Sequence, residues 1–138
     1  AQGPGSATER LSGLIRAHIS PLLDRGNFMK VFLTQRQFLP AHSRRKIRKV
    51  SRGIEAIFEE VLKQGQRSGE FRSDLDTRLA TLSILSVVNG CAAWYPREHA
   101  SIERIGGEFI SLILRGVDSP RAGAQARTRE ASPRPNSK

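Results

Sequence analysis

A stretch without charge, residues 79–95 (LATLSILSVVNGCAAWY), most constrains what this chain of 138 residues can fold into. Such a continuous apolar stretch has to be buried, either by lipid or by the rest of the protein. It is shorter than the roughly 20 residues needed to cross a bilayer, and it contains Thr81, Ser83, Ser86 and Asn89. We therefore expect a helix that is buried by other helices of the protein, and no membrane partner.

Hydrophobic spacing along the rest of the chain predicts further helices. Apolar residues recur at every third or fourth position over 8–24, 27–38, 41–67, 75–95 and 101–116, which is the pattern of helices buried on one face. The predicted buried face of the third helix carries Ile47, Val50, Ile54, Ile57, Phe58, Val61 and Leu62, and that of the fifth carries Ile102, Ile105, Phe109, Leu112 and Ile113. No segment alternates as a strand does. The sequence therefore predicts an all-α fold of five helices with short connections.

The connection between the third and fourth helices contains two acidic residues that resemble a metal or catalytic site. Gly69 suits the left-handed position after a helix end, and Phe71 can pack back on the third helix. Asp74 is expected to cap the fourth helix, with Asp76 in its first turn. Carboxylates two positions apart on a helix point about 200° apart, so the pair is not expected to bind a metal.

Composition divides the chain into a domain and two flanking segments. Residues 1–6 are small and flexible and are expected to be a linker or a cloning remnant. Residues 118–138 carry few apolar side chains and supply +3 of the net charge of +10, so we expect a basic disordered tail. The domain, 7–117, keeps the remaining +7. Its single cysteine, Cys91, allows no disulfide within the chain, which fits a reducing, cytoplasmic compartment.

Three segments follow one another in a distinctive order: ERLSGLIRAHISPLL, then EVLKQGQRSGEFRSDLDTRLATLSILSVVNGCAAWYP, then SIERIGGEFISLILRGV. In that order they resemble the C-terminal, ligand-binding half of TetR-family transcriptional repressors. In this family a helix ends in Gly-Glu-Phe-Arg, an Asp opens an apolar helix that ends near Trp-Tyr, and a last helix ends in a Leu-Leu-x-Gly-like pattern. The resemblance covers about residues 8–117. It implies a five-helix ligand-binding domain whose last two helices form a four-helix bundle with a second copy.

The family's N-terminal helix-turn-helix domain has no counterpart in these residues. The resemblance therefore implies that the chain begins at the family's fifth helix and that operator DNA is contacted only through a domain not in this chain. It further implies a homodimer that binds a small hydrophobic or acyl-type effector. We expect an effector-sensing and dimerisation domain, without a cofactor.

Small residues on the last two predicted helices are where the resemblance places the dimer interface. Glycine inside a helix costs about 0.5–1 kcal/mol relative to alanine, so Gly106 and Gly107 need a packing reason. Close packing within one chain or pairing with a second copy would supply it. The candidate interface residues are Ser86, Gly90, Ala93, Trp94, Gly106, Ile110, Ile113 and Leu114.

Candidate effector contacts come from the helices that precede this pair. Asn89 and His18 are polar residues on otherwise apolar faces, so each needs a partner, either within the protein or on a ligand. Aromatic residues at helical spacing are more often core residues than ligand contacts. The candidate lining residues are His18, Phe28, Phe32, Phe58, Leu62, Leu85 and Asn89.

The segment RRKIRKVSR, residues 44–52, is strongly basic and has three interpretations. It is a solvated helix face partly balanced by glutamates, or a clamp for an anionic effector such as a coenzyme A thioester or fatty acid, or a nucleic-acid contact. The third would make the chain a small basic nucleic-acid-binding protein that also uses its tail. The glutamates are Glu55, Glu59 and Glu60, and the candidate clamp residues are Arg44, Arg45 and Arg48.

An enzyme is the function class that the sequence favours least. We find no pairing of a nucleophile with a base, no metal-ligand spacing and no glycine loop that would hold a phosphate. The histidines His18, His42 and His99 are scattered without a pattern of partners.

Overall fold

Four α-helices account for most of the fold. A computed structural model describes residues 5–24 and 35–120. The helices are α1 (Ala7–Asp24), α3 (Ala41–Ser68), α4 (Thr77–Trp94) and α5 (Ile102–Val117), with the short 3-10 helices η1 (Arg36–Phe38) and η2 (Tyr95–Arg97). Within the described residues, β-type pairing is limited to one bridge between Phe71 and Asp118. The all-α prediction is confirmed. The helix predicted over 27–38 lies mostly outside the described residues, and its described end is η1.

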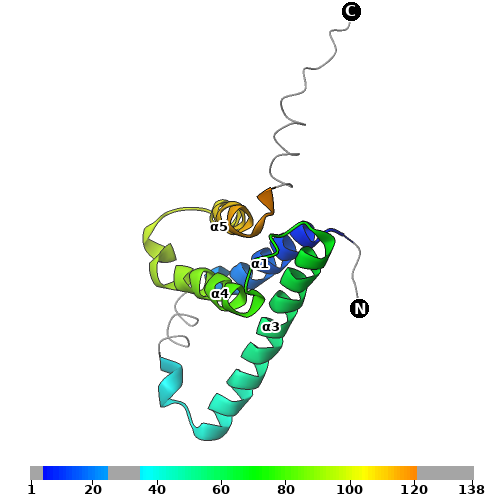
Figure 1. The fold of residues 1–138 in the computed structure, drawn as a ribbon. Coiled ribbons are helices and arrows are strands. Elements are labelled where there is room, and N and C mark those ends of the chain that lie inside the picture. Colours follow the sequence, from blue (N-terminus) through cyan, green and yellow to red (C-terminus); the bar gives the residue numbers. More distant parts are fainter. Residues whose placement is uncertain (1–4, 25–34, 121–138) are drawn as a thin grey trace, which may run out of the picture.

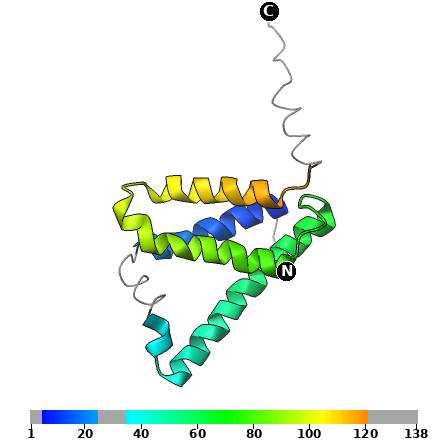
Figure 2. The same cartoon turned by 60° about the vertical axis from the view of Figure 1, so that its left-hand side comes forward.

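Helix α1 is the centre of the fold, because it packs against α3, α4 and α5. Helices α4 and α5 run alongside each other with α1 behind them, while the N-terminal half of α3 extends beyond the other helices (Figures 1 and 2). All four helices contribute to one core, which includes Leu11, Ile15, Phe58, Leu62, Val88, Cys91 and Ile110.

The uncharged segment forms α4 and is covered by protein on one side. Val88 and Cys91 on that side are fully buried. Among the described helices none is both long enough and apolar enough to cross a membrane.

Several apolar residues that the sequence predicts to be buried are exposed in the structure. Val50 and Ile57 of α3 are 64% and 54% exposed, and Leu112 of α5 is 66% exposed, so their prediction as buried residues is wrong for the single chain. Val50 belongs by its number to the N-terminal half of α3. That half of the helix extends beyond the other helices (Figure 2). Leu112 lines a groove between α4 and α5.

The connection between α3 and α4 is fixed by a close contact of glycine with an aromatic ring. Helix α3 ends at Gly69, whose φ of 77° is left-handed, as predicted. The chain then turns back, and the Phe71 N–H donates to the Gly65 carbonyl at 2.9 Å. The Phe71 side chain is 1% exposed and lies so close to Gly65 that a Cβ atom there would overlap its ring. The predicted packing of Phe71 on the third helix is confirmed.

The same connection, residues 69–72, also holds both ends of the domain. The Glu70 carboxylate accepts hydrogen bonds from the Ala7 and Thr8 N–H groups, both at 3.1 Å. The Arg72 N–H donates to the Val117 carbonyl at 2.9 Å. Burial by itself would raise the pKa of Glu70, but the backbone hydrogen bonds outweigh it and hold this pKa below its usual value. The start of α1 and the end of α5 are therefore attached to one short loop.

Asp76, and not Asp74, caps α4, so the prediction of Asp74 as the cap is wrong. The Asp76 carboxylate accepts a hydrogen bond from the Leu79 N–H at 2.9 Å. Asp74 is exposed and lies 3.6 Å from the Arg72 guanidinium. The reason is the position of the helix start: Thr77 is the first helical residue, and the residue before it supplies the cap.

We expect Asp76→Ala to lower the free energy of unfolding by about 1 kcal/mol, because it removes the acceptor for an N–H group of the first turn. Asp74→Ala is the matched control and should change it by less than about 0.5 kcal/mol, since exposed ion pairs contribute little. Urea denaturation followed by circular dichroism measures both. Equal effects of the two substitutions would contradict the assignment of the cap.

Candidate dimerisation and effector-binding surfaces

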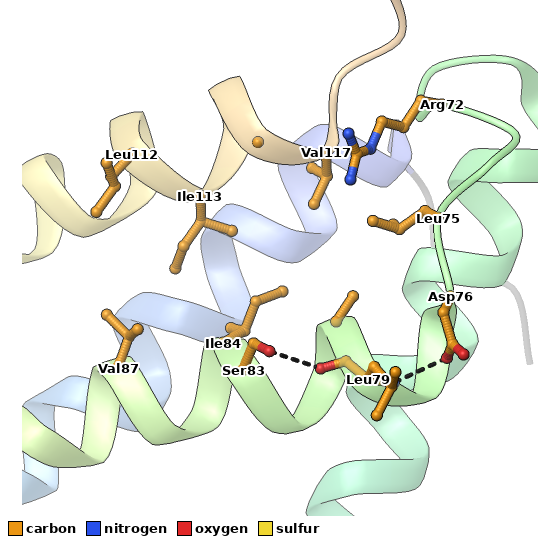
Figure 3. Close-up of a pocket in the computed structure, with 12 residues that line it drawn as sticks. Arg72, Leu75, Asp76, Leu79, Ser83, Ile84, Val87, Leu112, Ile113 and Val117 are labelled. Carbon is orange, nitrogen blue, oxygen red and sulfur yellow. Dashed lines mark hydrogen bonds between the residues drawn. The ribbon is translucent and has the colours of Figure 1, made fainter.

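An apolar groove lies between α4 and α5 on the side away from α1. Its volume is about 410 Å³. Leu79, Ser83 and Val87 of α4 line this groove together with Leu112 and Ile113 of α5, and Val87 points towards α5 (Figure 3). The other lining residues are Arg72, Leu75, Asp76, Ala80, Ile84, Gly116 and Val117.

The serines beside this apolar groove do not make it polar. Each serine hydroxyl donates to a backbone carbonyl of its own helix, Ser83 to Leu79 at 2.8 Å and Ser86 to Leu82 at 2.7 Å. Leu79, Val87 and Leu112 are 61%, 43% and 66% exposed. The groove therefore presents apolar side chains to solvent while its hydroxyl groups are already satisfied, which is a surface suited to burial against another apolar surface.

The glycines of α4 and α5 have no close contact within one chain. A Cβ atom added at Gly90, Gly106 or Gly107 would meet no atom within 4 Å. Close packing within the described residues therefore does not account for Gly90 and Gly107, which are exposed, whereas Gly106 is buried by its own chain.

The predicted interface residues divide into two groups. Ser86, Gly90 and Ala93 are exposed on α4, and Trp94 and Leu114 are half-buried. Gly106, Ile110 and Ile113 are buried, so a partner chain would find them largely covered by their own chain. Three exposed groove residues, Leu79, Val87 and Leu112, were not among the predicted interface residues. Their apolar character was visible in the sequence, but helical periodicity does not tell an interface side chain from a core side chain.

Trp94, the last residue of α4, packs against α5. Its ring lies 6.1 Å from the ring of Phe109, centre to centre, in a tilted arrangement. Aromatic pairs at such distances stabilise packing beyond the area that they bury. Trp94 therefore joins the end of α4 to α5 within one chain.

His18 and Asn89 satisfy each other. The His18 Nε2 lies 2.8 Å from the Asn89 Oδ1, and since an amide oxygen only accepts, the imidazole N–H donates. The His18 ring also meets the Phe58 ring edge-on, with centres 6.0 Å apart. This bond links α1 to α4 and answers why two polar residues lie on apolar faces. Both residues are only partly buried.

A small hollow between α1 and α3 adjoins this pair. Its volume is about 170 Å³, and Leu14, Ala17, His18, Ile54, Ile57 and Phe58 line it. We call it the His18 hollow. Of the other predicted effector contacts, Leu62 and Leu85 are buried in the core, and Phe28 and Phe32 lie outside the described residues.

A second groove is lined mainly by arginines and lies between η1, α3 and α4. Its volume is about 490 Å³. We call it the arginine groove, and it is lined by Arg36, Gln37, Arg44, Ile47, Arg48, Ser51, Arg52, Glu55 and Arg78. Two of the three predicted clamp residues, Arg44 and Arg48, are among these residues, whereas Arg45 is not.

The described residues offer no evident centre for metal or thiol chemistry. In the described ranges, no three His, Cys, Asp or Glu side chains are placed to hold a metal ion. Cys91 is buried, and burial raises the pKa of its thiol, which disfavours the reactive thiolate.

Comparison with known proteins places this fold in a family. Residues 4–117 match the family model described as the tetracyclin repressor-like C-terminal domain. Among curated proteins, the HTH-type transcriptional repressor KstR2 of Rhodococcus jostii (strain RHA1) is 31% identical over 61 residues, which cover 44% of this chain and 30% of the relative.

Two solved structures share the arrangement of helices. One is the ketosteroid transcriptional regulator KstR2 of Mycobacterium tuberculosis, with a TM-score of 0.76, 24% identity, and coverage of 85% of this chain and 61% of that one. The other is a TetR/AcrR-family transcriptional regulator of Thermobifida fusca YX-ER1, with a TM-score of 0.72, 27% identity, and coverage of 83% and 60%. The chain thus spans less than two thirds of each relative. Since the family model covers residues 4–117 of the 138, the chain belongs to the TetR family of transcriptional regulators as a tetracyclin repressor-like C-terminal domain.

Proposed function

We propose that this domain senses a small apolar or acyl effector and forms the homodimer of a TetR-family transcriptional regulator. The observation that carries the proposal is the apolar groove between α4 and α5, with its exposed Leu79, Val87 and Leu112. Operator DNA is contacted by a domain outside these residues, and the bound effector controls that contact.

The apolar groove supports a dimer built on α4 and α5. Exposed apolar side chains of this size gain free energy when a partner buries them. The glycines at positions 90 and 107 are exposed and leave room for a close approach of helix backbones. A twofold arrangement would place the same surface of both copies face to face, which is the commonest geometry of homodimers.

The His18 hollow supports the effector site. It combines apolar walls with one polar group, and ligand pockets are mostly apolar with a few placed polar groups. At about 170 Å³ it is smaller than most ligand pockets, so it accommodates only part of an effector. One relative is described as a ketosteroid transcriptional regulator, which makes ring compounds worth including among the effectors tested.

The effector would act by shifting an equilibrium between two arrangements of the dimer. A ligand changes such an equilibrium only by binding one arrangement better than the other. The His18–Asn89 bond joins α1 to α4, and α4 lines the apolar groove. A ligand that replaces this bond therefore changes how α1 sits on a helix of the dimer interface.

Thermal melting tests the effector site. Fatty acids, sterol-like compounds and planar aromatics would be screened for a rise in melting temperature. A ligand at one hundred times its dissociation constant stabilises the folded state by about 2.7 kcal/mol, which is a shift on the order of several degrees for a domain of this size. We expect at least one of these classes to produce such a shift.

Ala17→Phe provides the matched test of location. Ala17 lines the His18 hollow, and a phenyl ring there would occupy the hollow, so the melting shift should disappear. Ala56→Phe adds the same ring at an exposed position of α3 that does not line the hollow, and the shift should remain. A ligand shift that survives Ala17→Phe would place the effector elsewhere.

A further inference from the structure

The arginine groove is assembled from three elements that are distant in sequence. Arg36 comes from η1, Arg44, Arg48 and Arg52 come from α3, and Arg78 comes from the start of α4. On α3 the three arginines follow one another at intervals of four residues, so they project from one face of the helix. The groove is therefore concave and carries positive charge on several sides.

This positive charge is not neutralised by the described residues around it. Glu55 is the one carboxylate among the lining residues, and it is paired with Arg78 at 2.6 Å. Arg44 donates to the Gln37 carbonyl at 3.4 Å, which leaves its charge in place. Within the described residues, no ion pair involves Arg36, Arg48 or Arg52.

The glutamates farther along α3 do not balance the arginines either. Glu59 is paired with Lys63 at 2.8 Å, and Glu60 with Arg67 at 2.7 Å. Helix α3 is thus divided into an N-terminal half with unbalanced positive charge and a C-terminal half with internal ion pairs. Like charges four residues apart destabilise a helix, so the face carries an electrostatic cost that a bound anion would remove.

Arginine is the side chain that best fits a phosphate group. Its planar guanidinium donates two parallel hydrogen bonds to phosphate oxygens. The several guanidinium groups of the arginine groove can bind more oxygen atoms than a single carboxylate offers. They therefore fit a ligand with several phosphate oxygens better than they fit a carboxylate. The N-terminal end of α3, where Arg44 lies, adds the positive end of a helix dipole.

We propose that the arginine groove binds the phosphate groups of a small organic ligand that carries at least two of them. This proposal rests on the proposed function, because the phosphorylated ligand would be the effector. Glu55 of the groove is next to Ile54, which lines the His18 hollow. Because α3 contributes residues to both sites, we expect the apolar part of such a ligand to extend over α3 towards the His18 hollow.

Calorimetric titration of the whole chain with inorganic pyrophosphate and with adenosine diphosphate tests the proposal. The double variant Arg48→Gln/Arg52→Gln removes two groove arginines and should weaken binding of both probes about tenfold or more, since hydrogen bonds between charged groups are the strong ones. The control, Arg45→Gln/Lys49→Gln, removes the same charge from exposed positions of α3 outside the groove. It should weaken binding less than about threefold, because it reduces only the long-range electrostatic attraction between the positively charged chain and the anion.

Three results would overturn the proposal. Equal losses in the two double variants would mean that net charge, not the groove, attracts the anions. Absence of binding by both probes at millimolar concentration would show that no phosphate site exists. Duplex DNA that binds more tightly than either probe, with a loss confined to the groove variant, would assign the arginines to nucleic acid. The melting shifts caused by fatty acids or sterol-like compounds, and the mass of the dimer, test the proposed function separately.

Discussion

A chain with Leu112 replaced by glutamate is expected to be monomeric at concentrations where the unmodified chain is a dimer. Leu112 is 66% exposed in the single chain and lies on the wall of the apolar groove. In a twofold dimer, Leu112→Glu would place one carboxylate from each copy in an apolar interface, where an unpaired charge is costly. Light scattering at micromolar concentration measures the mass directly.

Val50→Glu is the matched control for this experiment. Val50 is also an apolar side chain with high exposure, 64%, but it lies on α3 and does not line the groove between α4 and α5. The Val50→Glu chain should remain a dimer. Gly90→Leu should weaken the dimer without adding charge, since it fills the open space above α4. An unmodified chain that is monomeric at these concentrations would refute the proposed dimer, as would equal behaviour of the two glutamate variants.

Loss of the Phe71 ring should be among the most destabilising single substitutions in this domain. Phe71→Ala removes a side chain that is 1% exposed and leaves a cavity against α3. Substitutions of this kind lower the free energy of unfolding by about 3–5 kcal/mol. This is a large share of the roughly 5–15 kcal/mol of a typical domain. Urea denaturation should therefore show a much lower midpoint, or a chain that is partly unfolded in buffer.

Two glycines on α3 test the reason for this sensitivity. A Cβ atom at Gly65 would overlap the Phe71 ring, whereas one at Gly53 would meet no atom within 4 Å. Gly53→Ala should raise the free energy of unfolding by about 0.8–1 kcal/mol, because alanine is the better helix former. Gly65→Ala should lower it by about 1–3 kcal/mol, the usual cost of overpacking. The same sign for both substitutions would mean that Phe71 does not pack against Gly65 in solution.

The helices themselves could be predicted because helical periodicity is a local property of the sequence. The segment 79–95 and the pattern around Phe58 each identify a helix without knowledge of its neighbours. The sequence places the cap of α4 two residues too early, because Asp74 and Asp76 are both good caps and only the path of the chain decides between them. Exposure of Val50 was not predictable either, since the pattern identifies an apolar face but not what covers it.

The candidate sites required the structure because their residues are distant in sequence. The sequence indicates that His18 and Asn89 each need a partner, but not that they are partners across 71 positions. It identifies Arg44 and Arg48 as basic neighbours, yet Arg78 joins them only because α4 begins beside α3. Arg45 has the same charge and adjacent position but lines no groove, since a shift of one residue turns a side chain by about 100°.

The 69–72 loop has a consequence for how the domain opens. Terminal helices usually open locally at a lower free energy than the rest of a fold. Here the start of α1 is attached through the Glu70 carboxylate, 63 residues away. The end of α5 is attached by the Arg72 N–H, which donates to the Val117 carbonyl, and by the Ser119 N–H, which donates to the Glu70 carbonyl. If one terminal helix separates from the 69–72 loop, the loop loses hydrogen-bond partners. The same loop holds the other terminal helix, so that helix is then held less firmly. We therefore expect the two ends of the domain to open as one cooperative unit instead of fraying independently.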